Sequence, residues 1–193
     1  MKAVYLFSYY LLYPLMLLLY PMKISGRGNI PSGASIICAN HSSAIDPVLL
    51  GFAIGPSVFI RFMAKAELFK SRFLSRVIGL YGGFSIDRGK NDINAIRTVM
   101  KFINNGETIG IFPEGTRKEE DDLSSGKTGT VRIAAKFKVP VLPVYMSRNK
   151  KLFRRIYVNI GEPYYISAEG KSDYSKSAEE LMQRIYDLKG SGH

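Results

Sequence analysis

The chain has 193 residues, of which 46% are hydrophobic and 22% charged, a balance typical of one globular domain and incompatible with intrinsic disorder. A single cysteine, Cys38, excludes a disulfide framework and a cysteine-based zinc site, and it is typical of a reducing compartment. The formal net charge of +11 favours a polyanionic partner, either nucleic acid or an anionic lipid surface.

The first predicted element is an uncharged run from Ala3 to Met22, AVYLFSYYLLYPLMLLLYPM. Twenty helical residues are about 30 Å long, close to the hydrocarbon thickness of a bilayer. Tyrosines recur along the run, and their amphipathic rings favour the depth of lipid headgroups. We therefore expect a membrane anchor over residues 1–23. Pro14 leaves open whether the anchor crosses the bilayer or lies bent in one leaflet, and a buried core helix is the alternative.

The chain after the anchor keeps nearly all of the positive charge, since the first 22 residues contain one lysine and no acid. We find no zinc-finger spacing, no aromatic RNP-like strand and no arginine-rich helix, so nucleic acid is not an expected partner. A basic domain tethered to a membrane is expected to lie against anionic headgroups, each nearby lysine or arginine contributing about 1 kcal/mol.

Short apolar runs then alternate with amphipathic segments. Strands are expected at residues 34–39, 57–64, 82–86, 107–112, 139–146 and 155–160, and helices at residues 42–52, 91–105, 126–138 and 177–188. The prolines of the 139–146 run predict a strand at a sheet edge or bulge, and Ser177 with Glu180 predicts a capping box. This alternation predicts a single α/β sandwich over residues 24–189, with a mixed, largely parallel sheet flanked by helices. Residues 190–193 are expected to be an appended tail.

The stretch Asn40-His41-Ser42-Ser43-Ala44-Ile45-Asp46-Pro47 follows the first of these strands, at the sheet edge where α/β proteins present ligands. Asp46 can turn back beneath the imidazole of His41 and accept a hydrogen bond from one ring nitrogen, which leaves the other nitrogen basic. The pair predicts a general base without a protein nucleophile, so that a substrate hydroxyl attacks. The alternative is that His41 caps the helix and Asp46 is an ordinary acid of its first turn.

Two further clusters follow predicted strands. Phe112-Pro113-Glu114-Gly115-Thr116-Arg117 comes directly after the 107–112 strand, and Gly82-Gly83-Phe84-Ser85-Ile86-Asp87-Arg88 contains the 82–86 strand. The planar guanidinium of arginine suits phosphate. These clusters predict two arginines and one base at the same sheet edge.

Four motifs occur in order between residues 24 and 160: Asn-His-x4-Asp, Gly-x-x-x-Ile-Asp-Arg, Phe-Pro-Glu-Gly-Thr-Arg and Val-Pro-x-x-Pro. Together they resemble the motifs of the glycerolipid acyltransferases, specifically the 1-acyl-sn-glycerol-3-phosphate acyltransferase family. The resemblance implies that His41 deprotonates the glycerol hydroxyl of lysophosphatidic acid while Asp46 orients His41. The hydroxyl then attacks an acyl thioester, from acyl-CoA or acyl carrier protein, to give phosphatidic acid. The resemblance also implies that no metal or bound cofactor is needed, and that the active site lies on the cytoplasmic face of a membrane.

The resemblance assigns binding residues as well. Those implied to hold or surround the acceptor, with the two arginines on its phosphate, are Lys65, Arg88, Glu114, Gly115, Thr116 and Arg117. Those implied to line the acyl or thioester side are Val139, Pro140 and Pro143.

Three alternatives remain open at this point. The acceptor could be glycerol-3-phosphate or another lysophospholipid, since the motifs do not separate these. Water could replace the acceptor, which would make the protein a thioesterase-like hydrolase. The fold could also serve as a catalytically silent binding module for a membrane surface or nucleic acid. The His41 and Asp46 pair argues against the last alternative, because a binding module has no need of an oriented base.

Overall fold

The computed structural model describes residues 2–86, 93–168 and 170–190. Its centre is a seven-stranded sheet with the order β1-β7-β6-β2-β5-β3-β4. Neighbouring strands pair in parallel except β6 and β7, which are antiparallel. The strands are β1 Met22–Ser25, β2 Ser35–Ala39, β3 Ile60–Lys65, β4 Phe84–Ile86, β5 Thr108–Ile111, β6 Val141–Met146 and β7 Ile156–Ile160. The predicted mixed, largely parallel sheet is confirmed.

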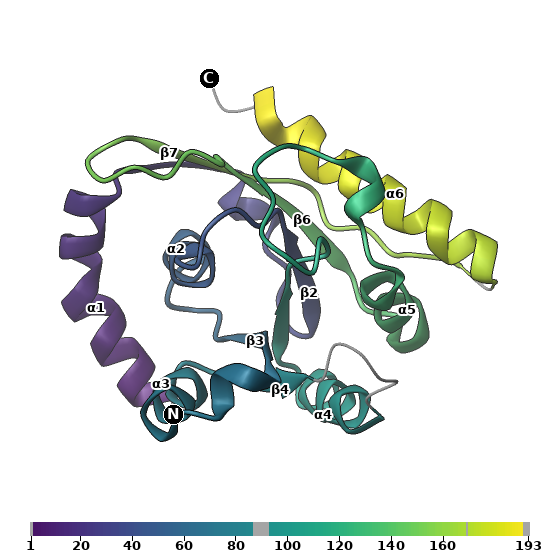
Figure 1. Ribbon diagram of the computed structural model, residues 1–193, viewed down its shortest axis with the longest axis horizontal. Helices are drawn as coiled ribbons and strands as arrows, with labels where there is room; N and C mark the ends of the chain where they lie inside the picture. Colours follow the sequence, from purple (N-terminus) through teal and green to yellow (C-terminus); the bar gives the residue numbers. More distant parts are fainter. Residues whose placement is uncertain (1, 87–92, 169, 191–193) are drawn as a thin grey trace.

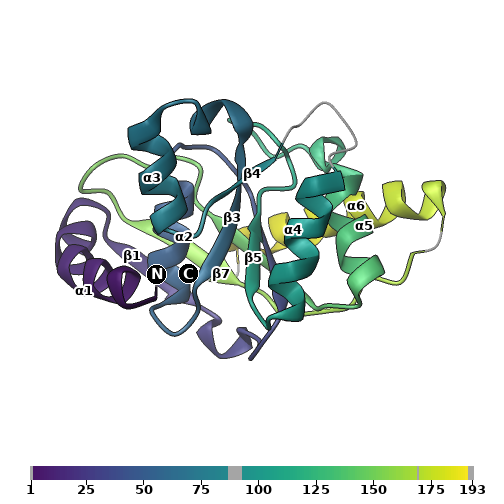
Figure 2. The ribbon, with the colours of Figure 1, turned by 90° about the horizontal axis from the view of Figure 1, so that it is seen from below.

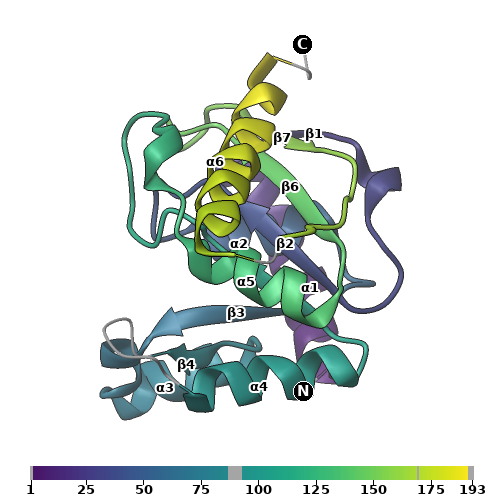
Figure 3. The same ribbon diagram turned by 90° about the vertical axis from the view of Figure 1, so that its right-hand side faces the viewer.

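Helices cover both faces of the sheet, with α1 and α2 on one side and α4, α5 and α6 on the other (Figure 1). Figure 3 shows α4, α5 and α6 on their side of the sheet. The helices are α1 Lys2–Leu19, α2 Asp46–Ile54, α3 Arg72–Leu80, α4 Ile93–Asn104, α5 Thr128–Phe137 and α6 Lys171–Asp187. Short 3-10 turns are η1 Arg27–Asn29, η2 Ala66–Phe69, η3 Leu123–Ser125 and η4 Leu188–Gly190.

Strand β2 is buried along its whole length, and its residues after Ser35 are apolar because both of its faces are covered. Ile36 and Cys38 pack in the cluster beneath α4, α5 and α6, whereas Ile37 and Ala39 pack in the cluster beneath α2. All four side chains are fully buried. Burying an isoleucine side chain contributes about 1.5–3 kcal/mol, so the two clusters hold β2 at the middle of the fold.

The position predicted for the 139–146 strand is wrong, because β6 lies inside the sheet between β7 and β2. Pro143 is tolerated there because the β6–β7 ladder begins only at Val144 and Ile160. The Pro143 carbonyl accepts a hydrogen bond from the N–H of Gly161, just past the end of β7, so Pro143 lies beyond the last residue pair of that ladder.

Two predicted helix starts also differ. Helix α6 begins at Lys171, with Gly170 before it, so Ser177 lies inside the helix and no capping box forms. Helix α2 begins at Asp46 rather than at Ser42, because the backbone N–H groups of Ser42 and Ser43 bind the Asp46 side chain in a tight turn. The sequence analysis did not identify α3, or β1, which pairs with β7.

Helix α1 packs one side on the domain and exposes the other. The Tyr9 ring is buried against Phe52 of α2, and its hydroxyl donates to the Phe52 carbonyl at 3.3 Å. Large apolar side chains cover the opposite side, with Phe7 69% exposed. Within the described part of the chain, no helix combines the length and the apolar character needed to cross a membrane. The predicted anchor is therefore not confirmed by the structure.

Candidate active site

His41 and Asp46 meet at the carboxyl edge of the sheet, which is the edge where the parallel strands end. His41 Nδ1 lies 2.8 Å from Asp46 Oδ2. The same carboxylate oxygen accepts the backbone N–H groups of Ser42 at 2.7 Å and Ser43 at 2.9 Å. The turn predicted from the five-residue spacing therefore forms, and it aims the carboxylate at one nitrogen of the imidazole.

Asp46 is fully buried but held in its ionised form. Burial opposes ionisation, yet the hydrogen bond from His41, the charge of Lys150 and the two backbone N–H groups outweigh it and lower the pKa of Asp46. A charged Asp46 accepts the Nδ1 proton of His41 and leaves Nε2 with a free lone pair. This arrangement is that of an oriented general base.

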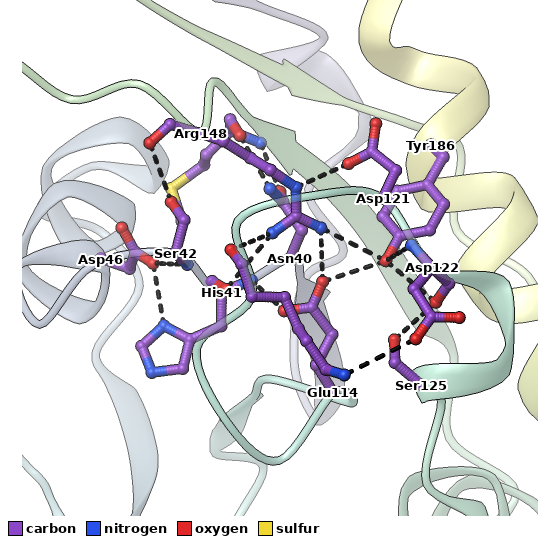
Figure 4. A network of polar contacts seen from close by, with 12 residues as sticks. Asn40, His41, Ser42, Asp46, Glu114, Asp121, Asp122, Ser125, Arg148 and Tyr186 are labelled. Atoms are coloured by element: carbon purple, nitrogen blue, oxygen red, sulfur yellow. Dashed lines mark hydrogen bonds and ion pairs between the residues drawn. The ribbon is translucent and has the colours of Figure 1, made fainter.

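The His41 ring lies against an aromatic wall. It stacks on Phe112 with 4.3 Å between ring centroids, and Phe112 in turn stacks on Phe62 of β3 at 6.2 Å. The His41 side chain is 17% exposed, so it is enclosed but still accessible. In Figure 4 its ring points away from the polar groups around Glu114. A ligand can therefore reach the imidazole beside an apolar surface.

Glu114 ties the loop after β5 to His41. Its Oε2 accepts the backbone N–H of His41 at 2.8 Å, and its Oε1 accepts Nη2 of Arg148 at 2.6 Å and the hydroxyl of Tyr186 at 3.0 Å (Figure 4). Arg148 also donates from Nε to Asp121 at 2.6 Å and from Nη1 to the Lys118 carbonyl at 2.8 Å. We call Glu114, Arg148, Asp121 and Tyr186 the Glu114–Arg148 network.

The Glu114–Arg148 network is buried and charged. Burial disfavours the charged guanidinium, but the hydrogen bonds that it donates to Glu114 and Asp121 outweigh this effect and raise the pKa of Arg148. Glu114 is itself fully buried with both carboxylate oxygens occupied. It therefore fixes the loop against His41 and leaves no free oxygen for a ligand.

The other residues predicted from the acceptor-side motifs lie in different settings. Gly115 has a φ of 72°, the left-handed conformation that favours glycine, and it turns the chain so that Thr116 and Arg117 are exposed. Arg117 directly precedes Lys118, whose N–H donates to the His41 carbonyl at 2.8 Å. Lys65 ends β3 and pairs at the surface with Glu67. Arg88 lies outside the described residues.

The structure does not bring the residues predicted for the acyl side to His41. Val139 is buried in the cluster beneath α4, α5 and α6, and Pro140 accepts the N–H of Ile36 through its carbonyl. Both precede β6, at the amino end of a strand parallel to β2. Pro143 is buried in the middle of β6, where it pairs with Cys38.

The sequence analysis assigned no role to three polar residues of the site. Asn40 is fully buried and exchanges hydrogen bonds with the backbone of Met146 at 2.8 and 2.7 Å, which joins the ends of β2 and β6. Arg148 and Lys150 follow the carboxyl end of β6, the same kind of position that singled out His41. Applying that rule to every parallel strand would have found them.

A hollow elsewhere in the fold does not coincide with this site. Among the residues that the structure describes, no group of three His, Cys, Asp or Glu side chains could hold a metal ion. A hollow of about 720 Å³ is lined by residues that include Arg27, Gly55 and Glu107, at the edge where β3 and β5 begin. Because His41 lies at the other edge, we place the chemistry at His41 and not in this hollow.

Comparisons with known proteins identify the family of the chain. A family model described as Acyltransferase matches residues 21–147, the segment that contains His41, Asp46, Glu114 and Arg117. A 1-acyl-sn-glycerol-3-phosphate acyltransferase of Bacillus subtilis is 33% identical over 177 residues, which cover 86% of this chain and 87% of that protein. One of Borreliella burgdorferi is 31% identical, with 86% of this chain and 67% of the relative covered. The crystal structure of the 1-acyl-sn-glycerophosphate (LPA) acyltransferase PlsC from Thermotoga maritima matches with a TM-score of 0.72 and 25% identity, covering 98% of this chain and 80% of that one.

Proposed function

The chain belongs to the acyltransferase family, and from this premise we propose that it transfers an acyl chain from a thioester to the free hydroxyl of lysophosphatidic acid, giving phosphatidic acid for phospholipid synthesis. The observation that carries the proposal is the 2.8 Å contact between His41 Nδ1 and a buried, ionised Asp46, at the sheet edge that the family match includes. Curated relatives named for this reaction support the choice of acceptor.

The proposed reaction uses His41 as general base. Its Nε2 takes the proton of the acceptor hydroxyl as the oxygen attacks the thioester carbonyl, and Asp46 stabilises the imidazolium that forms. The tetrahedral intermediate collapses with cleavage of the carbon–sulfur bond, and the departing thiolate receives the proton from His41. The products are the ester and a free thiol, so the imidazole returns to its starting state.

Arg117 is the proposed phosphate ligand among the described residues. Its side chain is exposed on the loop that Glu114 and Lys118 attach to the backbone of His41. A guanidinium can grip a phosphomonoester through two parallel hydrogen bonds and so fix the distance between phosphate and hydroxyl. Arg88 stays a predicted second ligand.

The acyl donor is proposed to be acyl-CoA or acyl carrier protein. Both are anionic and suit a chain of net charge +11. Steady-state rates with purified donors of equal chain length would separate the two. Both donors present the same thioester and differ only in the carrier that the enzyme must recognise.

We also propose that the enzyme works at an anionic phospholipid surface, facing the cytoplasm, where thioester donors are found. The support is an exposed apolar surface on α1 and α3, which lie on the same side of the sheet (Figure 2). Phe73 of α3 is 79% exposed, and Arg72 and Arg76 on the same helix supply positive charge with no acidic residue in the first turn. Apolar side chains flanked by cations favour binding to anionic lipid.

The decisive experiment measures release of free thiol from acyl-CoA with and without lysophosphatidic acid, with products resolved by lipid class. Thiol release that requires the acceptor and yields phosphatidic acid supports the proposal. Equal release without acceptor would identify a thioesterase. Release only with glycerol-3-phosphate or another lysophospholipid would reassign the acceptor, and no release with any donor would favour a binding module.

A further inference from the structure

Lys150 places a buried cation against the carboxylate that orients His41. Its side chain is 1% exposed, and Nζ lies 2.9 Å from Asp46 Oδ1. The same ammonium donates to the hydroxyl of Ser42 at 2.7 Å. The two oxygens of Asp46 are thus divided, with Oδ2 serving His41 and the backbone while Oδ1 faces Lys150.

Ammonium groups are rarely buried unless they are paired, and Lys150 is buried with Asp46 as its partner. Burial lowers the pKa of Lys150, and the charge of Asp46 opposes that effect. The enclosed side chain cannot touch a substrate, so any influence on catalysis must pass through Asp46 or Ser42.

We propose that Lys150 is a positioning residue for the His41–Asp46 pair: it fixes the Asp46 carboxylate and offsets the negative charge that this carboxylate presents to the imidazole of His41. The assignment of His41 as base rests on the proposed function, whereas the electrostatic effect on the imidazole does not. An uncompensated carboxylate would favour the imidazolium and so remove the free base.

The other charged groups around His41 do not offset the charge of Asp46. Glu114 binds the His41 N–H, and its charge is matched by Arg148, whose Nη1 also lies 3.4 Å from the His41 carbonyl. Asp121 is shared between Arg148 and Lys189. Three other cations at this edge are exposed or half-exposed, namely Lys65, Arg117 and Lys118. Lys118 contacts His41 through its backbone N–H, which donates to the His41 carbonyl.

The test is an NMR titration of the imidazole in Lys150→Met, with the full chain in detergent micelles. The sequence contains two histidines, His41 and His193, so the His41 resonance is identified by its loss in His41→Ala. We expect the titration midpoint of His41 to rise by about one pH unit in Lys150→Met. We expect the acidic limb of the kcat/KM profile to move with it.

Lys150→Arg keeps the charge and should restore the wild-type midpoint, while Lys151→Met removes an exposed neighbouring lysine and should change nothing. If Lys150→Met does not fold, Lys150→Gln retains a donor for Ser42 without the charge and carries the same test. An unchanged midpoint in the folded neutral variant, with kcat lowered equally at all pH values, would overturn the proposal. Activity retained in His41→Ala would instead overturn the proposed function and leave the titration result standing.

Discussion

The carboxyl edge around His41 and the outer surface of α1 and α3 are built in opposite ways. At the edge, buried charges from the ends of β2, β5 and β6 bind one another, and each side chain has several partners. On α3 no residue is buried, and α1 exposes large apolar side chains. The first region is fixed by many specific contacts, whereas the second offers apolar area without a partner. Substitutions should therefore damage chemistry or folding in the first region and only lipid binding in the second.

The largest effect is expected from His41→Ala. Loss of a positioned general base should lower kcat by about 10²–10⁴-fold. The melting temperature should stay near that of the wild type, because the backbone N–H of His41 still binds Glu114. Initial rates with acyl-CoA and lysophosphatidic acid, together with a thermal melt, check both expectations. More than about a tenth of wild-type activity would contradict the assignment.

The next effect concerns folding, and Arg148→Met tests it. The Arg148 side chain is 11% exposed, and its loss leaves the fully buried Glu114 without its cation, whereas Asp121 keeps Lys189. Removing one partner of a buried ion pair destabilises a protein by about 3–5 kcal/mol. Urea unfolding measures this difference.

Arg184→Met is the matched control, since the exposed Arg184 pairs with Glu180 one turn away on α6 and lies over the Tyr164 ring at 4.2 Å. A loss of about 1 kcal/mol or less is expected there. Equal losses for the two arginines would show that the Glu114–Arg148 network does not hold the edge together.

The edge was predictable from sequence only where its residues are close along the chain. His41 and Asp46 are five residues apart, so their contact follows from one tight turn. Ser42 and Lys150 are 108 residues apart, and a lysine after an apolar strand resembles an ordinary surface residue until the strand order is known. The position of β6 inside the sheet could not be predicted either, since no local pattern shows that Pro143 lies at the end of β7.

The α1 and α3 surface shows a different limit of sequence analysis. The apolar run at the start of the chain was recognised, but its packing on α2 through Tyr9 depends on Phe52, which lies far along the chain. Helix α3, unlike the equally short α2, has no buried residue, and the sequence analysis missed it. Periodicity identifies helices most clearly when a long apolar face packs on a sheet.

Arg117→Lys should have a moderate effect within the site region. The substitution keeps the charge but loses the two parallel hydrogen bonds, so kcat/KM for lysophosphatidic acid should fall about tenfold. Arg117 is exposed, and the melting temperature should not change. A monoacylglycerol acceptor lacks the phosphomonoester and should be used equally by the variant and the wild type. Equal losses on both acceptors would assign Arg117 to the acyl donor or to the loop structure.

The smallest effect is expected at α3, from Phe73→Ser. Phe73 is 79% exposed, so its replacement should leave the stability of the fold unchanged. Burial of a phenylalanine side chain in lipid contributes up to about 1.5–3 kcal/mol, and partial insertion should make binding to anionic vesicles several-fold weaker in the variant. Flotation with phosphatidylglycerol-containing vesicles measures this change. Tyr165→Ser is the matched control, because Tyr165 is also a largely exposed aromatic residue, at 68%. It lies next to Tyr164, which pairs with Val141 at the amino end of β6, the sheet edge opposite His41. If both variants bind like the wild type, α3 does not contact lipid, and the contrast between the two regions would rest on α1 alone.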